Sequence, residues 1–246
     1  TRVITRRVAY LCLQGIPPGQ ILALTFTNKA AGEMRRRVEG MNAPRGATVC
    51  TFHSLCVRLL REFAAEAGLS RNFTIYDRTD QLRAVKEAME KSDARTAGLS
   101  PTKVHSIISR NKNALKTAES LAADTQNHLL QTVRRIHRQY DAVLAANNAL
   151  DFDDLLLRMA MLMRDRPEVT EALNLRYRYV LIDEFQDTNY AQYVIAHGIA
   201  MGHENICVTG DPDQSIYAWR GADISNILEF ESDYPDAAVI RLEQNY

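Results

Sequence analysis

Two adjacent carboxylates, Asp183 and Glu184, follow a short apolar run over residues 179–182. The run has the length and the branched residues of a buried strand. In open α/β sheets ligands bind at the carboxyl ends of strands, so this pair stands where a reaction would take place. One carboxylate can hold Mg²⁺ while its neighbour orients and deprotonates water. The simpler alternative is an acidic pair that only caps the following helix.

A second apolar run, residues 206–209, leads into Gly210, Asp211 and Pro212, which favour a turn. Gln214 follows this turn. Its uncharged amide can bond to a phosphate oxygen or to an attacking water. A group in this position is therefore suited to sense the terminal phosphate of a nucleotide.

The chain has a single tryptophan, Trp219, with Tyr217 and Arg220 close by. Flat aromatic faces beside a guanidinium suit stacking on unpaired bases, which is worth about 1–3 kcal/mol per base. A tryptophan is nonetheless more often part of the hydrophobic core. The local sequence alone leaves both interpretations open.

Polar residues follow two further strand-like runs near the start of the chain. Residues 21–26 pass into Thr27, Asn28 and Lys29, and residues 48–51 pass into a segment that contains His53. Hydroxyl, amide and ammonium groups beside helix N-terminal N–H groups suit a phosphate of a nucleic-acid backbone. An ordinary N-cap can explain each segment taken separately. Capping alone explains less well why two such segments each follow directly after a strand.

The elements that must hold these groups alternate between strands and helices. Several of the strand-like runs are apolar throughout, which predicts strands buried on both faces of a parallel sheet. Apolar residues at steps of three and four predict helices between them, one of them with Asn28 as its N-cap. The alternation predicts an α/β fold. The predicted strands are residues 21–26, 48–51, 73–76, 179–182, 206–209 and 238–242.

The strand patterns give way to long helical ones over residues 78–172. We expect a helical insertion there, dividing the sheet domain into residues 1–77 and 173–246. Apolar residues at helical spacing are assigned to core packing. Asp151, Asp153 and Asp154 are interpreted as an N-cap with acids in the first helical turn, because they lack the spacing and glycine of a calcium site.

Composition sets the class of protein. The chain has 246 residues, 46% of them hydrophobic and 24% charged, which is typical of a folded chain with a real core. No run approaches the roughly 18 apolar residues of a membrane helix, so no membrane partner is expected. The four cysteines form no CxxC pair, which favours a reducing compartment and a cytoplasmic location. Cys50, His53 and Cys56 lack a fourth zinc ligand nearby.

The charges are uneven although the formal net charge is zero. Residues 1–78 hold 12 Lys and Arg against five Asp and Glu, whereas residues 173–246 hold four against 12. A basic segment can face a nucleic-acid backbone, and clustered carboxylates can hold a divalent cation. Mutual neutralisation of the two ends in the folded chain is the alternative.

Five ordered segments closely resemble motifs Ia, Ib, II, III and the start of IV of UvrD/Rep/PcrA-type superfamily 1 DNA helicases. They are residues 25–31, 51–54, 183–188, 210–222 and 242–246. The resemblance extends over essentially the whole chain and includes residues 150–156. It implies a RecA-like parallel sheet flanked by helices, with an all-helical inserted subdomain.

The resemblance implies an ATP-driven motor that moves 3′ to 5′ along single-stranded DNA and separates duplexes. Asp183 would bind Mg²⁺ together with Thr1, which resembles the last residue of a Walker A loop. Glu184 would act as the catalytic base, and Gln214 would link the γ-phosphate to the DNA site. The residues that the resemblance places on ATP are Thr1, Arg2, Gln214 and Tyr246.

On the DNA side, the resemblance implies a path for the strand that is lined by residues of motifs Ia, Ib and III. These residues are Phe26, Thr27, Asn28, His53, Tyr217, Trp219 and Arg220. The implied partners are single-stranded DNA, duplex junctions and a second RecA-like half of the same full-length chain. The Walker A glycines and lysine would precede Thr1, so we expect a fragment that alone neither hydrolyses ATP nor unwinds DNA appreciably.

Two alternatives stay open. The first is the motor part of a helicase–nuclease recombination complex, which shares these motifs. The second is a non-catalytic nucleic-acid-binding module whose ATP site has decayed, although the intact Asp183, Glu184 and Gln214 argue against decay.

Overall fold

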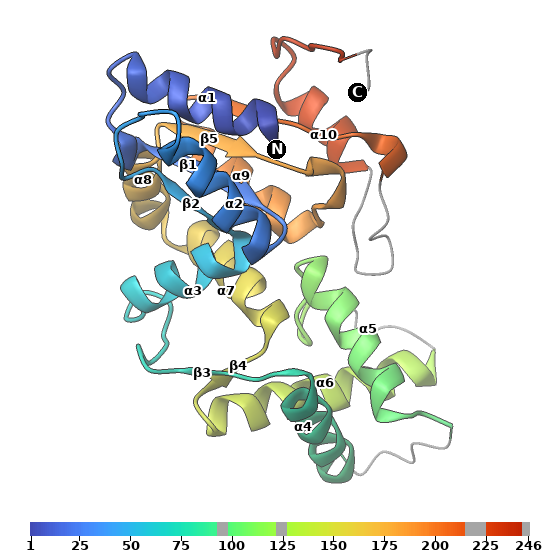
Figure 1. Ribbon diagram of the computed structural model, residues 1–246. Coiled ribbons are helices and arrows are strands. Elements are labelled where there is room, and N and C mark those ends of the chain that lie inside the picture. The colour runs from blue at the N-terminus through green and yellow to red at the C-terminus, as the bar shows by residue number, and fades with distance from the viewer. Residues whose placement is uncertain (93–97, 122–126, 215–224, 243–246) are drawn as a thin grey trace.

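A four-stranded parallel sheet organises the chain in the computed structural model (Figure 1). The structure describes residues 1–92, 98–121, 127–214 and 225–242. The strand order is β2-β1-β5-β6, with β2 (Thr48–Thr51), β1 (Ile21–Thr25), β5 (Tyr179–Ile182) and β6 (Ile206–Val208). The expected α/β fold with a parallel sheet between helices is confirmed.

Helices cover both faces of this sheet. One face carries α1 (Arg2–Leu13) and α2 (Asn28–Glu39), and the other carries α3 (Phe52–Glu62), α7 (Phe152–Asp165), α8 (Pro167–Arg176) and α9 (Tyr190–Ala200). Successive side chains of a strand point to opposite faces. In β1, Ile21 and Ala23 accordingly join the core under α1 and α2, whereas Leu22 and Leu24 join the opposite core. Burial on both faces explains why the strand is apolar throughout.

The inserted helices form a separate layer with their own core. This layer consists of α4 (Arg78–Lys91), α5 (Pro101–Asn113) and α6 (His128–Ala146). Val85, Ile108 and Ile136 are fully or almost fully buried between them. In Figure 1 the layer lies beneath the sheet domain, and β3 and β4 run side by side where the chain enters and leaves it.

The inserted layer ends at a small sheet. The strands β3 (Thr74–Ile75) and β4 (Ala149–Leu150) pair in parallel where the chain enters and leaves the layer. Beyond them, α7 and α8 pack with the main sheet, since Leu155 and Leu173 share a core with Val180. The limits of the insertion at residues 78 and 172 stay a prediction, and this packing favours an earlier end, before α7.

Two strand predictions differ from the structure. Residues 73–76 contribute a strand, but it pairs with β4 and does not join the main sheet. Residues 238–242 form no strand, and Val239, Ile240 and Leu242 are 70%, 82% and 77% exposed. A strand must pair its N–H and C=O groups with a neighbour. In the described part of the chain no ladder includes these residues.

The remaining elements connect or end these layers. They are the short helical turns η1 (Pro18–Gln20), η2 (Phe185–Asp187) and η3 (Pro212–Gln214), and the helix α10 (Ser225–Asp233). Among the described helices, none has both the length and the apolar character needed to cross a bilayer.

Candidate active site

Asp183 lies at the carboxyl end of β5, beside the end of β1. Its backbone N–H donates to the carbonyl of Leu24 at 2.9 Å, which extends the pairing of the two strands by one residue. From β1 the chain continues to β2 on one side, whereas β5 and β6 lie on the other. Such a reversal of strand order opens a crevice at the carboxyl ends, where ligands of open α/β sheets bind.

The Asp183 carboxylate is buried and only partly satisfied. Its side chain accepts a hydrogen bond from the Thr209 hydroxyl at 2.9 Å, and the Thr1 nitrogen lies 2.7 Å from the same oxygen, Oδ1. The other oxygen, Oδ2, is buried without a hydrogen-bond partner in the described structure. The hydroxyl of Thr25, at the end of β1, is likewise buried without a hydrogen-bond partner in the described structure. Unsatisfied buried polar atoms are costly, so they point to a polar ligand at this edge.

These groups fit Mg²⁺. In nucleotide sites Mg²⁺ is bound by one or two protein oxygens together with phosphate oxygens and water. The unpartnered Oδ2 of Asp183 is an oxygen donor of the right type, and Thr1 lies beside it. The described residues contain no cluster of three or more His, Cys, Asp or Glu side chains that could hold a metal. A Mg²⁺–nucleotide complex does not need such a cluster, because phosphate oxygens and water supply most of its ligands.

Glu184 leaves the strand in an unusual backbone conformation. Its φ is +55° and its ψ is +48°, which is the left-handed region that residues other than glycine seldom occupy. The next residue is locked to the neighbouring strand, because the Phe185 N–H donates to the Thr209 carbonyl at 2.9 Å. Conformations of this kind cost about 1–3 kcal/mol and concentrate at functional sites. The sharp turn leaves Glu184 half-buried while Asp183 is buried.

A chain of three hydrogen bonds joins Glu184 to Gln214. The Gln186 amide donates to Glu184 Oε2 at 2.9 Å, and its own oxygen accepts from the Asp211 N–H at 3.1 Å. Asp211 Oδ2 in turn accepts from the Gln214 amide at 2.5 Å. Gln214 itself is exposed. The two predicted catalytic groups are therefore connected through Gln186 and Asp211, neither of which is among the site residues predicted from the sequence.

Gly210 makes this connection possible. A Cβ at this position would lie 2.7 Å from Gln186 Oε1 and 3.3 Å from the Gln186 nitrogen. Any other residue would therefore push Gln186 away from Asp211 and Glu184. The signal that could have identified Gln186 is a polar amide two residues after Glu184, opposite a glycine-containing turn.

Motifs Ia and Ib meet at the ends of β1 and β2. The N-cap of α2 is Thr27 and not Asn28 as predicted, because the Thr27 hydroxyl accepts from the Ala30 N–H at 3.1 Å. Asn28 begins the helix instead, and its side-chain oxygen lies 3.4 Å from the hydroxyls of Thr51 and Ser54. Thr27 and Asn28 are exposed, and Phe26 is half-buried. The arrangement presents polar groups of both motifs on one surface.

His53 stands at the first turn of α3 beside an exposed phenylalanine. Its ring meets that of Phe152 edge to face, with centroids 5.9 Å apart. Phe152, the first residue of α7, is 47% exposed. A half-exposed aromatic ring next to the predicted DNA-side residue is a further candidate for contact with bases. The sequence did not identify this ring as a site residue, because Phe152 belongs to a helical apolar pattern typical of core.

Four predicted site residues lie outside the described residues. They are Tyr217, Trp219, Arg220 and Tyr246. Arg2 is the first residue of α1 and is exposed. Thr1 and Arg2 thus lie at the edge of the sheet that also carries Asp183.

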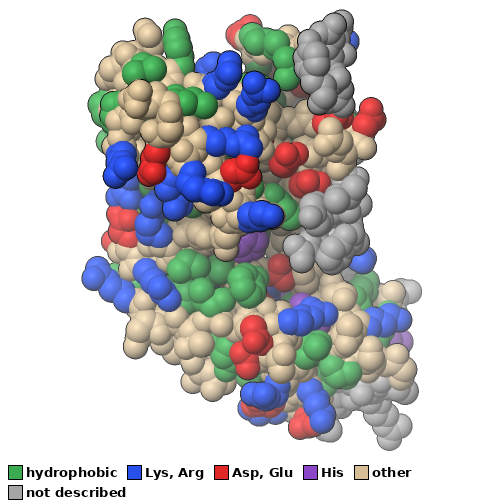
Figure 2. Space-filling model, viewed as in Figure 1, with side chains coloured by type: hydrophobic (Ala, Val, Ile, Leu, Met, Phe, Trp, Pro, Cys, Tyr) green, Lys and Arg blue, Asp and Glu red, His purple; other side chains and the backbone are tan. Residues whose placement is uncertain are grey.

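Lys and Arg side chains spread over the face formed by α1 and α2 (Figure 2). Among the described residues, none of the exposed arginines of these helices pairs with a carboxylate of residues 173–242. Arg37 pairs with Glu33 of its own helix. Ion pairs with the described part of the acidic end therefore do not neutralise the arginines of α1 and α2.

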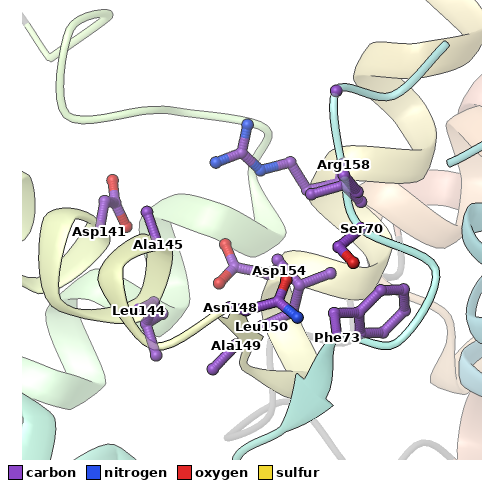
Figure 3. Close-up of a pocket in the computed structure, with 12 residues that line it drawn as sticks. Ser70, Phe73, Asp141, Leu144, Ala145, Asn148, Ala149, Leu150, Asp154 and Arg158 are labelled. Atoms are coloured by element: carbon purple, nitrogen blue, oxygen red, sulfur yellow. The ribbon is translucent and has the colours of Figure 1, made fainter. Parts of the chain in front are cut away.

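A small pocket lies away from these groups, between α6, β4 and α7 (Figure 3). Its volume is about 170 Å³. Asp154 of α7 faces Asp141 of α6 across it, and Arg158 lies at its rim. None of the predicted site residues lines this pocket. The unsatisfied oxygen of Asp183 and the left-handed Glu184 both lie at the strand ends, away from this pocket.

Comparison with known proteins gives consistent matches. A sequence model described as the UvrD/REP helicase N-terminal domain matches residues 1–235. The ATP-dependent DNA helicase PcrA of Staphylococcus epidermidis is 45% identical over 249 aligned residues, which cover 100% of this chain and 34% of that protein. PcrA of Bacillus subtilis is 45% identical over 250 residues with the same coverage, and PcrA of Staphylococcus aureus is 44% identical over 249. The chain spans about a third of the length of these relatives.

Proposed function

Because the chain belongs to the UvrD/REP helicase family, we propose that it is the first motor half of an ATP-dependent helicase that moves 3′ to 5′ along single-stranded DNA. The observation that most strongly supports this is the connection at the strand ends. A buried carboxylate with an unsatisfied oxygen adjoins a second carboxylate, which is hydrogen-bonded through Gln186 and Asp211 to Gln214. ATP hydrolysis then requires the second RecA-like half of the longer protein.

Asp183 and Thr1 would hold Mg²⁺ in this proposal. When bound, the ion would offset the negative charge of the phosphates. The hydrogen bond from Thr209 fixes the Asp183 carboxylate with Oδ2 left available. The N-terminus of α1 lies beside it, and its N–H groups favour an anion there.

Glu184 would accept the proton of the attacking water. Its carboxylate is oriented by the Gln186 amide, which leaves the second oxygen available for this role. A base must be held within hydrogen-bond reach of the proton that it takes. Gln214, at the other end of the chain of hydrogen bonds, would contact the γ-phosphate and link it to the DNA site.

Single-stranded DNA would cross the surface shared by motifs Ia and Ib. Thr27 and Asn28 offer exposed polar groups for the backbone, and His53 with Phe152 offers rings for the bases. Phe26 lies half-buried at the same end of β1. The roles of Tyr217, Trp219 and Arg220 on this path stay predictions.

The decisive experiment is Glu184→Gln in the full-length protein. We expect ATP binding to be kept and DNA-stimulated turnover to fall about 10³-fold or more, because loss of a positioned catalytic base typically costs at least 10²-fold. Glu204→Gln is the matched control, since Glu204 is an acid outside the site that also has a positive φ. Nucleotide affinity is measured with a fluorescent ATP analogue. Turnover within a few fold of wild type in Glu184→Gln would remove Glu184 from the role of base.

A further inference from the structure

A buried polar cluster holds the inserted helices against α7. Lys112, near the end of α5, is fully buried, with its Nζ 3.0 Å from Asp151 and 2.8 Å from Asp154. Asp141 of α6 lies 3.4 Å away, and the Tyr140 hydroxyl donates to Asp151 at 2.8 Å. The N-terminus of α7 is thereby fixed to α5 and α6.

The next residue, Asn113, extends the cluster toward the catalytic segment. Its amide nitrogen donates to Asp153 of α7 at 2.8 Å, and its oxygen accepts from the Asn189 amide at 2.5 Å. Asn113 and Asn189 are only 9% and 7% exposed. Asn189 is the N-cap of α9 and lies two residues after the end of η2, the turn that follows Glu184. One buried amide therefore joins α5, α7 and α9.

The other end of this link is the proposed DNA surface. Phe152, whose ring contacts His53, lies in the sequence between Asp151 and Asp153. Both acids are held in the buried cluster, Asp151 by Lys112 and Asp153 by Asn113. In Figure 1, α5 rises from the inserted layer toward the sheet domain, which is the position this connection requires. A shift of Phe152 would therefore move groups that Asn113 holds.

We propose that Asn113 is a positioning residue that couples DNA contact at Phe152 to the Glu184 segment through Asn189. The inference rests on the proposed function. Buried hydrogen bonds are costly to leave unmade, so α7 and α9 shift together and do not separate. Energetic coupling between sites is carried by contiguous networks of this kind. Asn113 contacts neither nucleotide nor DNA in this proposal, and acts only through Asn189 and Asp153.

Asn189→Asp in the full-length protein tests the link without removing the cap of α9. Asp and Asn are equally good N-caps, so the bond from the Gln192 N–H is kept while the donor to Asn113 is lost. We measure ATP turnover with and without a single-stranded oligothymidylate, the KM for ATP, and DNA affinity by fluorescence anisotropy. We expect DNA stimulation to fall about fivefold or more, the lower end of typical coupling. The DNA-free rate, the KM and the DNA affinity should change less than about twofold.

A second variant and a control complete the test. Asn113→Leu removes the bond to Asn189 and also the bond to Asp153, so it should lose at least as much stimulation. The double variant should lose no more than Asn113→Leu alone, because the bond between Asn113 and Asn189 is already absent there. Asn147→Ala is the control, since the Asn147 amide bonds within its own helix, to Val143 at 2.8 Å. If wild-type protein shows no DNA-stimulated turnover, the proposed function fails. If wild-type stimulation persists in Asn189→Asp, only the role of Asn113 is overturned.

Discussion

Replacing Lys112 by methionine should destabilise the chain strongly. Its ammonium is fully buried within 3.4 Å of three carboxylates, those of Asp141, Asp151 and Asp154. Methionine keeps most of the volume and the helix propensity but removes the positive charge that these acids share. Removal of one partner from a buried ion pair costs about 3–5 kcal/mol, because it leaves a buried charge uncompensated. We expect the free energy of unfolding to fall by about this amount.

Urea denaturation of the 246-residue chain, followed by circular dichroism, measures this change. Lys91→Met is the matched control, because Lys91 makes an exposed pair with Glu87 at 2.7 Å, one helical turn away. Exposed pairs of this spacing contribute about 0.3–0.5 kcal/mol. In thermal unfolding the Lys112 variant should melt about 10 °C lower, given about 2–4 °C per kcal/mol for a chain of this size. Equal losses in the two variants would refute the account of the cluster.

The pH dependence gives a second check on the same variant. Burial and the nearby Asp151 charge raise the pKa of Asp154 to about 7, against the opposing effect of Lys112. A raised carboxyl pKa favours the folded state at low pH, and this contribution is lost as the pH rises through about 7. Without Lys112 the pKa of Asp154 should rise further. The destabilisation should therefore be larger at pH 8 than at pH 5, and an equal loss at both would contradict the argument.

Three further outcomes follow from the structure. Gly210→Ala should reduce DNA-stimulated turnover of the full-length protein and leave DNA affinity unchanged, because the added Cβ would lie 2.7 Å from Gln186 Oε1. Unchanged turnover would count against a role for Gln186 in connecting Glu184 to Asp211. Burial, with help from the Arg78 charge, lowers the pKa of His105 to about 4, so stability should fall as pH drops from about 6.5 toward 4. In urea titrations His105→Gln should flatten that fall. Phe152→Ala should weaken the binding of single-stranded DNA about fivefold or more in anisotropy titrations, because one stacked base is lost. Leu175→Ala is the control, since Leu175 is 63% exposed, and it should leave this affinity unchanged.

The contacts that complete the site could not be predicted from the sequence, because they join segments that are distant along the chain. Gln186 meets Asp211, Asn113 meets Asn189 and His53 meets Phe152 only after the sheet and the inserted helices have packed. No local pattern encodes such partners, since each residue type is compatible with many surroundings. The run 238–242 shows the same limit, because strand formation depends on a neighbour that local propensity does not supply.

The sequence by itself determined the parts that local chemistry dictates. Strands buried on both faces must be apolar throughout, which identified β1 and β5, and the polar residues after them had to lie at the carboxyl edge of a parallel sheet. Tertiary structure alone decided which of those groups touch. It left Asp183 with an unsatisfied oxygen and joined Gln186 to Asp211, because packing brings together segments that lie far apart in the sequence.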